Sequence, residues 1–175
     1  MSRAIIGTVV AVLIFAGMSV ETQAPKPPKS PELKVLDHLV GSWRYEVVEG
    51  QANGDEKKST ATTVTKWSLQ GQYIESRVTD SDGKQVALNL MTYDSDVGVY
   101  QAWAFYPNSP KPFLFTYRWN ESKKTLTGNG DLGNGITLQA TTRFIGNDRY
   151  EFTGTMKDAS GNVPGEFKGN AFRKK

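Results

Sequence analysis

The stretch "HLVGSWRYE", residues 38–46, stands where the pattern of the sequence changes. Before Gly41, leucines recur at helical spacing and predict one short helix over residues 32–40. After Gly41, apolar and polar residues alternate with the period of a β-strand. Glycine allows the chain to turn sharply out of a helix, and Trp43 supplies a large rigid side chain just beyond the turn. This stretch therefore predicts the start of a β domain whose first strand carries a structural tryptophan.

Strand-like segments then follow one another to the end of the chain, with turn signals between them. They span residues 42–49, 59–69, 72–80, 84–94, 99–107, 113–120, 125–132, 136–145, 149–158 and 165–174. Short connections require antiparallel neighbours, because parallel crossovers need a dozen or more residues. Closure of the sheet removes its unpaired edges, so we expect an all-β fold, an antiparallel up-and-down barrel of about ten strands. A two-sheet sandwich is the alternative.

The division of side chains within the strands predicts which surface is buried. In segment 149–158, Tyr150, Phe152 and Met156 share one face and polar residues share the other, and segment 136–145 shows the same division. One apolar and one polar face are typical of a soluble barrel with a hydrophobic interior. An outer-membrane barrel requires the reverse, an outward apolar band with a polar lumen. The pattern therefore excludes a membrane barrel.

Composition limits the chemistry. The chain has 175 residues, 38% of them hydrophobic, a formal net charge of +3, a single His and no Cys. Thiol nucleophiles, thiolate metal sites and two-histidine metal sites are therefore excluded, and we expect no cofactor and no metal. The basic residues form no stripe, so the sequence gives no support to a nucleic-acid partner.

The N-terminal region has the features of an export signal. Residues 1–24 combine a positive start, an apolar run and the small-residue end "TQA", which predicts a cleaved signal peptide. Residues 25–32 form a Pro/Lys-rich linker, and residues 33–175 form the barrel domain. We therefore expect a secreted or periplasmic protein whose mature chain has no membrane span. Retention of the apolar run as an N-terminal anchor is the alternative, and the sequence leaves the oligomeric state open.

A helix followed by Gly-x-Trp on a first strand resembles the start of the lipocalins and of the wider calycin superfamily. The resembling residues are "LVGSW", residues 39–43. In those proteins the tryptophan closes the barrel bottom, and a basic residue on the last strand packs over its indole. The resemblance implies this closure for Gly41, Trp43 and Arg173.

The domain also resembles DUF1579, a bacterial family of secreted lipocalin-like proteins of unknown function. The resemblance is carried by "LVGSWRYE", "WSLQGQYIE" and "LMTYDSDVGVYQAWAF", which begin at residues 39, 67 and 90. It implies a fold and no catalytic residues. The more distant resemblance to haem-binding nitrobindin-like barrels implies a histidine on a late strand, whereas no histidine follows His38 in this chain.

Aromatic residues on facing strands suggest a lined interior. A charged pair, Glu75 and Arg77, shares a strand face with Tyr73, and that face points either inward or to solvent. If it points to solvent, Ile74, Ser76 and Val78 face the interior instead. The candidate lining residues are Tyr73, Glu75, Arg77, Trp103, Phe105, Phe115, Tyr117 and Trp119.

These features favour non-catalytic binding of a small, largely apolar ligand inside the barrel. One alternative is a calycin-type enzyme that uses Glu75, Arg77 and a tyrosine for acid–base chemistry. Another is an envelope interaction protein, for which we expect a filled barrel and an exposed apolar patch.

Overall fold

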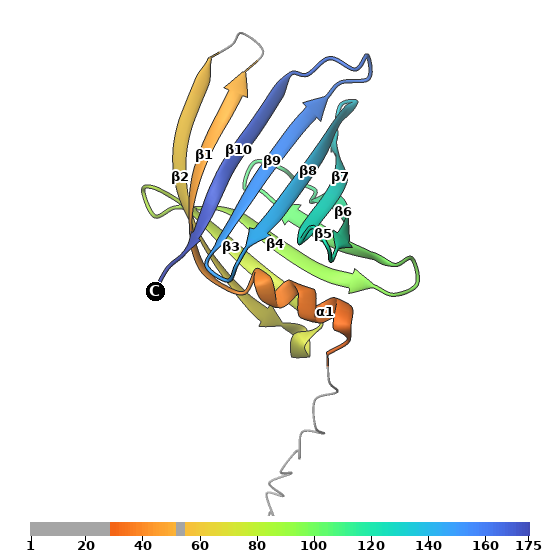
Figure 1. The fold of residues 1–175 in the computed structure, drawn as a ribbon. Coiled ribbons are helices and arrows are strands. Elements are labelled where there is room, and N and C mark those ends of the chain that lie inside the picture. The colour runs from red at the N-terminus through yellow and green to blue at the C-terminus, as the bar shows by residue number, and fades with distance from the viewer. Residues whose placement is uncertain (1–28, 52–54) are drawn as a thin grey trace, which may run out of the picture.

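A computed structural model describes residues 29–51 and 55–175, which form one closed barrel with a short helix at one end (Figure 1). The predicted signal peptide, residues 1–24, lies outside the described residues, as does the first half of the predicted linker, residues 25–28. Helix α1 (Pro31–Val35) continues into a 3₁₀ turn, Leu36–His38. The ten strands are β1 (Gly41–Gln51), β2 (Glu56–Ser68), β3 (Tyr73–Asp80), β4 (Gln85–Asp94), β5 (Val99–Phe105), β6 (Phe113–Asn120), β7 (Thr125–Gly133), β8 (Ile136–Ile145), β9 (Arg149–Lys157) and β10 (Gly165–Arg173).

Every strand pairs antiparallel with its sequence neighbour, and β1 pairs with β10 to close the sheet. The predicted up-and-down barrel of ten strands is therefore confirmed, and the sandwich alternative is wrong. Strand boundaries differ from the predicted ones by three residues at most, the largest difference being the earlier start of β2 at Glu56. The closing register sets Trp43 opposite Arg173 and continues to the end of β1 at Gln51. Closure satisfies the backbone groups that an open sheet of this length exposes at its edges.

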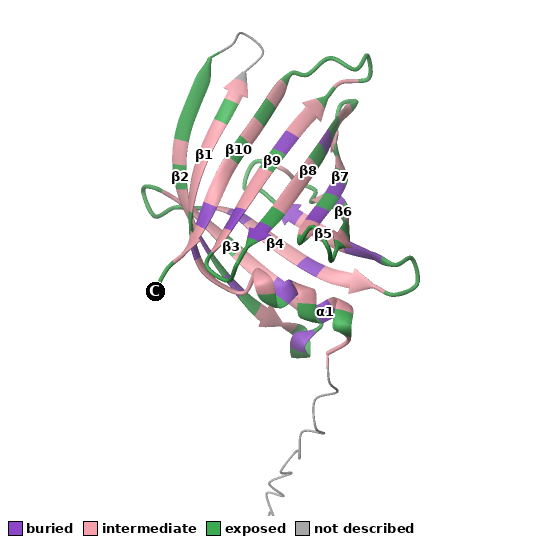
Figure 2. Ribbon diagram, in the orientation of Figure 1, coloured by how far each residue is buried: buried purple, intermediate pink, exposed green. Residues whose placement is uncertain are grey.

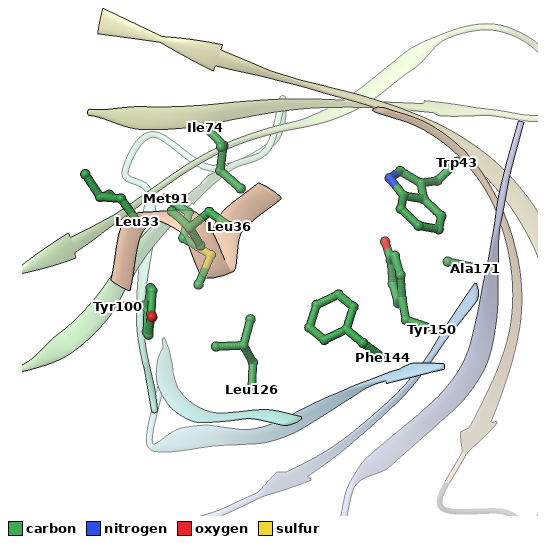
Figure 3. Close-up of a cluster of buried hydrophobic side chains, with 10 residues drawn as sticks. All are labelled: Leu33, Leu36, Trp43, Ile74, Met91, Tyr100, Leu126, Phe144, Tyr150 and Ala171. Carbon is green, nitrogen blue, oxygen red and sulfur yellow. The ribbon is translucent and has the colours of Figure 1, made fainter. Parts of the chain in front are cut away.

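The helix covers one end of the barrel. Its start is capped by Ser30, whose hydroxyl accepts a hydrogen bond from the backbone nitrogen of Leu33 at 3.2 Å, with Pro31 in the first turn. Leu33 and Leu36 point into the barrel and join a cluster of buried residues that fills this closed end (Figure 3). The remaining members of the cluster are Trp43, Ile74, Met91, Tyr100, Leu126, Phe144, Tyr150 and Ala171. The other end of the barrel carries mostly intermediate and exposed residues (Figure 2). The interior is therefore filled at the helix end and less so toward the opposite mouth.

Hydrogen bonds and ring contacts also hold the helical segment against the barrel. Asp37 accepts hydrogen bonds from the indole nitrogen of Trp67 at 2.7 Å and from the ammonium of Lys29 at 2.8 Å. Partial burial opposes ionisation of Asp37, but these two donors outweigh it and lower the carboxyl pKa below its usual value. The hydroxyl of Tyr100 donates to the backbone carbonyl of Glu32 at 2.9 Å. The lone histidine, His38, packs its ring against Trp119 and Phe144 beneath the barrel, with ring centroids 5.9 and 5.1 Å away.

Trp43 and Arg173 join the first and last strands of the barrel. Trp43 is 1% exposed and donates its indole proton to the carbonyl of Leu39 at 2.8 Å. The Arg173 guanidinium lies 4.2 Å from the centre of the Trp43 ring and donates to the carbonyls of Val40 at 2.7 Å and Asn147 at 2.8 Å. Gly41 has a φ of +129°, and a Cβ there would lie 2.3 Å from the Arg173 guanidinium. Glycine is therefore required at position 41 both for the turn and for the space that the arginine fills.

Replacing Arg173 with methionine is expected to lower the free energy of unfolding by about 2–4 kcal/mol. Methionine keeps much of the apolar stem but loses the cation over the indole and both hydrogen bonds to backbone carbonyls. Urea unfolding followed by tryptophan fluorescence measures the change. Arg143→Met is the control, because it removes an arginine whose exposed ion pair with Glu151 lies on the outer surface and should cost about 0–1 kcal/mol. Equal losses in the two variants would contradict a special role for Arg173.

Candidate functional site

The barrel encloses a cavity of about 330 Å³ that reaches from the closed-end cluster toward the mouth. This volume lies at the lower end of the range of small-molecule sites in proteins. The lining residues are Leu39, Tyr45, Thr63, Ile74, Ser76, Val78, Asn89, Met91, Ala102, Trp103, Ala104, Tyr106, Phe115, Tyr117, Leu126, Leu138, Ala140, Thr141, Thr142, Tyr150, Phe152, Thr153 and Phe167. Within the described part of the chain, none of these residues carries a charged side chain. The cavity therefore suits a neutral, largely apolar molecule.

Strand register places Tyr73, Glu75 and Arg77 on the outside of the barrel, so their predicted place in the lining is wrong. Their neighbours in β3 alternate with them and pair with inward residues of β2 and β4. Arg77 donates to the Glu75 carboxylate at 2.8 Å, and 56% of its side chain is exposed. The physical reason is the cost of removing two charges from water, which an apolar lumen does not repay.

The residues that line the cavity from β3 are Ile74, Ser76 and Val78, the other face of the same segment. Two aliphatic residues at alternate positions, Ile74 and Val78, are the sequence signal that favours this face. The sequence is compatible with either face of this strand, and the prediction of Tyr73, Glu75 and Arg77 as lining residues is the one that the structure contradicts.

Trp103 and Phe105 also belong to the outward series of their strand. Trp103 borders the cavity as part of the wall, but its ring lies 6.2 Å from the ring of Tyr73, and Phe105 is 37% exposed. The inward residues of β5 are Tyr100, which belongs to the closed-end cluster, and Ala102 and Ala104, which line the cavity. These alanines stand opposite Phe115 and Phe113 of β6, whose large side chains fill the same interior space. The inward positions of β5 beside the cavity therefore require small residues, whereas the sequence suggested the large residues Trp103 and Phe105 as the lining.

The three candidates from β6 do face the interior, in two different surroundings. Phe115 and Tyr117 line the cavity. Trp119 lies nearer the closed end, where its ring packs 5.8 Å from that of Phe144 and its indole nitrogen donates to Glu121 at 2.7 Å. Burial raises the pKa of Tyr117 to about 12, so its hydroxyl stays protonated at neutral pH.

Four aromatic rings lean sideways over glycines of the adjacent strand. The opposed pairs are Phe115 with Gly130, Tyr117 with Gly128, Phe167 with Gly154 and Phe152 with Gly169. A Cβ added at any of these glycines would meet a ring atom at 2.0–2.5 Å. Each ring thus occupies the space of a missing side chain and lies along the wall, which leaves the centre of the barrel open. Aromatic rings that cover glycines across a strand pair are a recognised device of curved sheets.

Three hydroxyls gather at the closed-end side of the cavity, from Tyr45, Thr63 and Tyr150. The two tyrosine oxygens lie 2.5 Å apart and share one hydrogen bond. Burial raises the pKa of both tyrosines, so both are neutral at physiological pH. Thr63 is close enough to influence the pKa of Tyr45, but its Oγ1 is buried and makes no hydrogen bond of ordinary geometry with a described residue. Trp43 supports the group from below, with its ring 4.7 Å from that of Tyr150.

A second polar strip follows the β2–β3–β4 wall. Ser76 and Thr65 share a hydrogen bond of 2.8 Å, and Asn89 stands opposite Ser76 on β4. None of these sites resembles a metal centre: among residues 29–51 and 55–175, no three His, Cys, Asp or Glu side chains are grouped to hold an ion. No helix in the described chain is long and apolar enough to cross a membrane.

Sequence reasoning identified the inward faces of β8 and β9 and missed most of the polar lining. Tyr45, Thr63 and Asn89 stand in strands whose two faces differ little in polarity, so alternation alone does not single them out. The Gly-x-Trp motif offers one signal for Tyr45. In a strand, residues two apart share a face, so an inward Trp43 places Tyr45 inward as well.

Comparison with known proteins agrees with this architecture. The family model described as "Protein of unknown function (DUF1579)" matches residues 28–168. No curated protein matches the chain in sequence. Among solved structures, Rv2717c from M. tuberculosis is similar, with a TM-score of 0.63, 12% identity and coverage of 85% of this chain and 100% of that one.

Two further solved structures share the fold. The S-type phycobiliprotein lyase CPES from Guillardia theta has a TM-score of 0.57 and 10% identity, with 81% of this chain and 92% of that chain covered. A DUF3598-family protein of unknown function from Nostoc punctiforme has a TM-score of 0.59 and 9% identity, with 79% of this chain covered. The match spans only 48% of the Nostoc protein, about half its length. At these identities the likeness shows the lipocalin-like fold alone, whereas the family match covers most of the sequence. The chain belongs to the DUF1579 family of proteins of unknown function.

Proposed function

We propose that this protein binds a small, largely apolar molecule inside its barrel. The observation that carries the proposal is the uncharged cavity of about 330 Å³, walled by aromatic rings that lean aside over glycines. A barrel selected only for stability gains from filling its interior, because empty apolar volume costs unfolding free energy. Here the residues at the centre of the β7–β8–β9 wall are Gly128, Ala140 and Gly154, the smallest available. This arrangement favours carriage over a purely structural role.

The enzyme alternative loses its main candidates in this geometry. Glu75 and Arg77 contact each other outside the barrel, on the opposite side of the wall from the cavity. A general acid or base must reach its substrate directly or through one water. Fold does not decide the matter, since a neighbour with the same fold is named a lyase. Binding is therefore the function that the position of the side chains supports best.

Export remains part of the proposal. It rests on residues 1–24, which have the charge, apolar run and small-residue end of a signal peptide. The intact mass of the protein isolated from its own host tests it. We expect a mature chain that begins at Pro25, and a mass that retains the apolar run would favour the N-terminal anchor instead.

A large side chain placed in the cavity should weaken binding without unfolding the barrel. Ala140 points into the lumen between two glycines, whereas the preceding residue, Gln139, is exposed and points outward. Ala140→Phe is expected to weaken binding of the neutral fluorescent probe N-phenyl-1-naphthylamine by about tenfold or more, at a stability cost of about 1–3 kcal/mol. Fluorescence titration measures the affinity and thermal unfolding verifies the fold. Gln139→Phe is the matched control, because Gln139 does not line the cavity, and it should bind as the wild type does. Loss of affinity in the control alone, or in neither variant, would contradict a binding site in the barrel.

A substitution that displaces one of the leaning rings should also weaken binding. A Cβ at position 154 would lie 2.2 Å from the Phe167 ring, so Gly154→Ala must push that ring toward the lumen. We expect both weaker probe binding and a loss of about 1–3 kcal/mol in the free energy of unfolding. Gly165→Ala is the control, because a Cβ there meets its nearest atom, the Met156 sulfur, at an ordinary 3.7 Å. Unchanged probe affinity in Gly154→Ala would mean that Phe167 does not border the bound molecule.

A further inference from the structure

Among the described residues, a group of hydroxyls in the barrel interior has hydrogen-bonding capacity that the fold uses only in part. It is formed by the hydroxyls of Tyr45, Thr63 and Tyr150, at the closed-end side of the cavity. We propose that this hydroxyl group is the polar anchor of the site and that the ligand is a neutral, planar aromatic molecule with a carbonyl oxygen. The inference rests on the proposed binding function and names the class of ligand that the site takes.

Hydrogen-bond accounting supports an acceptor on the ligand. Three hydroxyls carry three protons, and the bond between Tyr45 and Tyr150 uses one of them. Thr63 is 1% exposed and its oxygen has no partner within residues 29–51 and 55–175. Thr63 also lies close enough to Tyr45 to lower the pKa of its hydroxyl, so one or two of the three donors remain without an acceptor in an apolar surrounding. A carbonyl oxygen has two lone pairs and can accept from one or both of them.

The absence of charge among the described lining residues decides between a carbonyl and a carboxylate. Burying an ionised carboxylate without a cationic partner is costly, and hydroxyls alone do not offset it. The charge of Arg173 acts on Tyr150, but this guanidinium lies over Trp43 and is occupied by two backbone carbonyls and by Asp148. A neutral oxygen acceptor therefore matches the site better than an anion.

The aromatic walls indicate the shape of the rest of the molecule. Phe115 and Tyr117 on one wall and Phe152 and Phe167 on another lean over their opposed glycines. Rings that lie along a wall offer their surfaces to the lumen, where a flat aromatic molecule can pack against them. The small residues Ala102, Ala104 and Ala140 widen the space beside these rings.

Equilibrium dialysis with matched probes tests each part of this assignment. The probes are 2-acetylnaphthalene, 2-ethylnaphthalene without the oxygen, the anion 2-naphthoate, and the saturated analogue 2-acetyldecalin. We expect the purified protein to bind 2-acetylnaphthalene about tenfold more tightly than the ethyl compound and more tightly than naphthoate. The saturated ketone should bind at least about threefold more weakly than the aromatic one.

Thr63→Val is the diagnostic variant, because valine keeps the shape of threonine and removes only the hydroxyl. It should reduce the preference for the ketone to within about threefold, leave binding of 2-ethylnaphthalene unchanged, and raise Tm by about 2–4 °C. Tyr45→Phe should reduce the preference in the same way. Thr65→Val is the matched control on the same strand: its hydroxyl is already bonded to Ser76 at 2.8 Å, so its loss should lower Tm and leave the preference intact.

Each other outcome overturns a defined part. Equal binding of ketone and ethyl probes by the wild type, or tighter binding of naphthoate, overturns the carbonyl anchor but leaves the proposed binding function standing. A preference that survives in Thr63→Val, or a lower Tm in that variant, shows that the hydroxyl has a structural partner and overturns its role. Equal binding of 2-acetyldecalin overturns the planar shape. Failure of all four probes to bind, together with unchanged behaviour of Ala140→Phe toward N-phenyl-1-naphthylamine, overturns the proposed function itself.

Discussion

The structure depends on the contact that closes the barrel, where Trp43 at the start of β1 meets Arg173 at the end of β10. The guanidinium reaches back across 133 residues to the carbonyl of Val40, so the first and last strands are fixed by side chains as well as by their ladder. The contact also fixes which face of β1 points inward. Because side chains alternate along a strand, and the pairing register shifts only near the ends of β3 and β7, the inward face of β1 is linked through the ladder to the inward faces of the other strands. The orientation of Trp43 is thus coupled to the set of side chains that line the lumen.

That dependence explains how much the sequence could reveal. Ten strands, a short helix and closure followed from alternation, turn residues and the cost of open edges, and the structure confirms them. The inward faces of β8 and β9 were also predictable, because one face of each is clearly apolar. In β3 the aliphatic Ile74 and Val78 favour the inward face, whereas in β5 both faces hold apolar side chains and the local pattern does not choose between them. In β5 the inward face is determined by the neighbouring strand: Ala102 is small, and the side chain of Phe115, opposite it on β6, fills the interior at that level.

The open lumen reflects a balance between large and small residues across strand pairs. Glycine within a strand loses backbone entropy on folding and contributes no side chain to the core. The opposed aromatic ring recovers part of this cost, because it covers the bare backbone of Gly130 or Gly154 with apolar surface. If each glycine and aromatic pair were replaced by two side chains of intermediate size, the wall would be comparably covered, but more side-chain atoms would project toward the barrel axis. The glycine and aromatic pairs therefore combine a stable wall with free volume, and neither property requires a loop or a moving part.

The same reasoning makes the hydroxyl of Thr63 informative. A buried hydroxyl without a partner lowers stability by about 1–3 kcal/mol, and valine at the same position of a strand avoids that loss at almost no change in shape. The neighbouring Thr65 shows what a purely structural hydroxyl looks like in this barrel, since it is bonded to Ser76 within the wall. Thr63 instead borders the cavity beside Tyr45 and Tyr150, where its Oγ1 has no hydrogen-bond partner of ordinary geometry among the described residues and a molecule inside the lumen can supply one. Trp43 and Arg173 thus close the end of the barrel, and the neighbouring hydroxyls of the tyrosines and of Thr63 offer hydrogen-bond donors to the cavity.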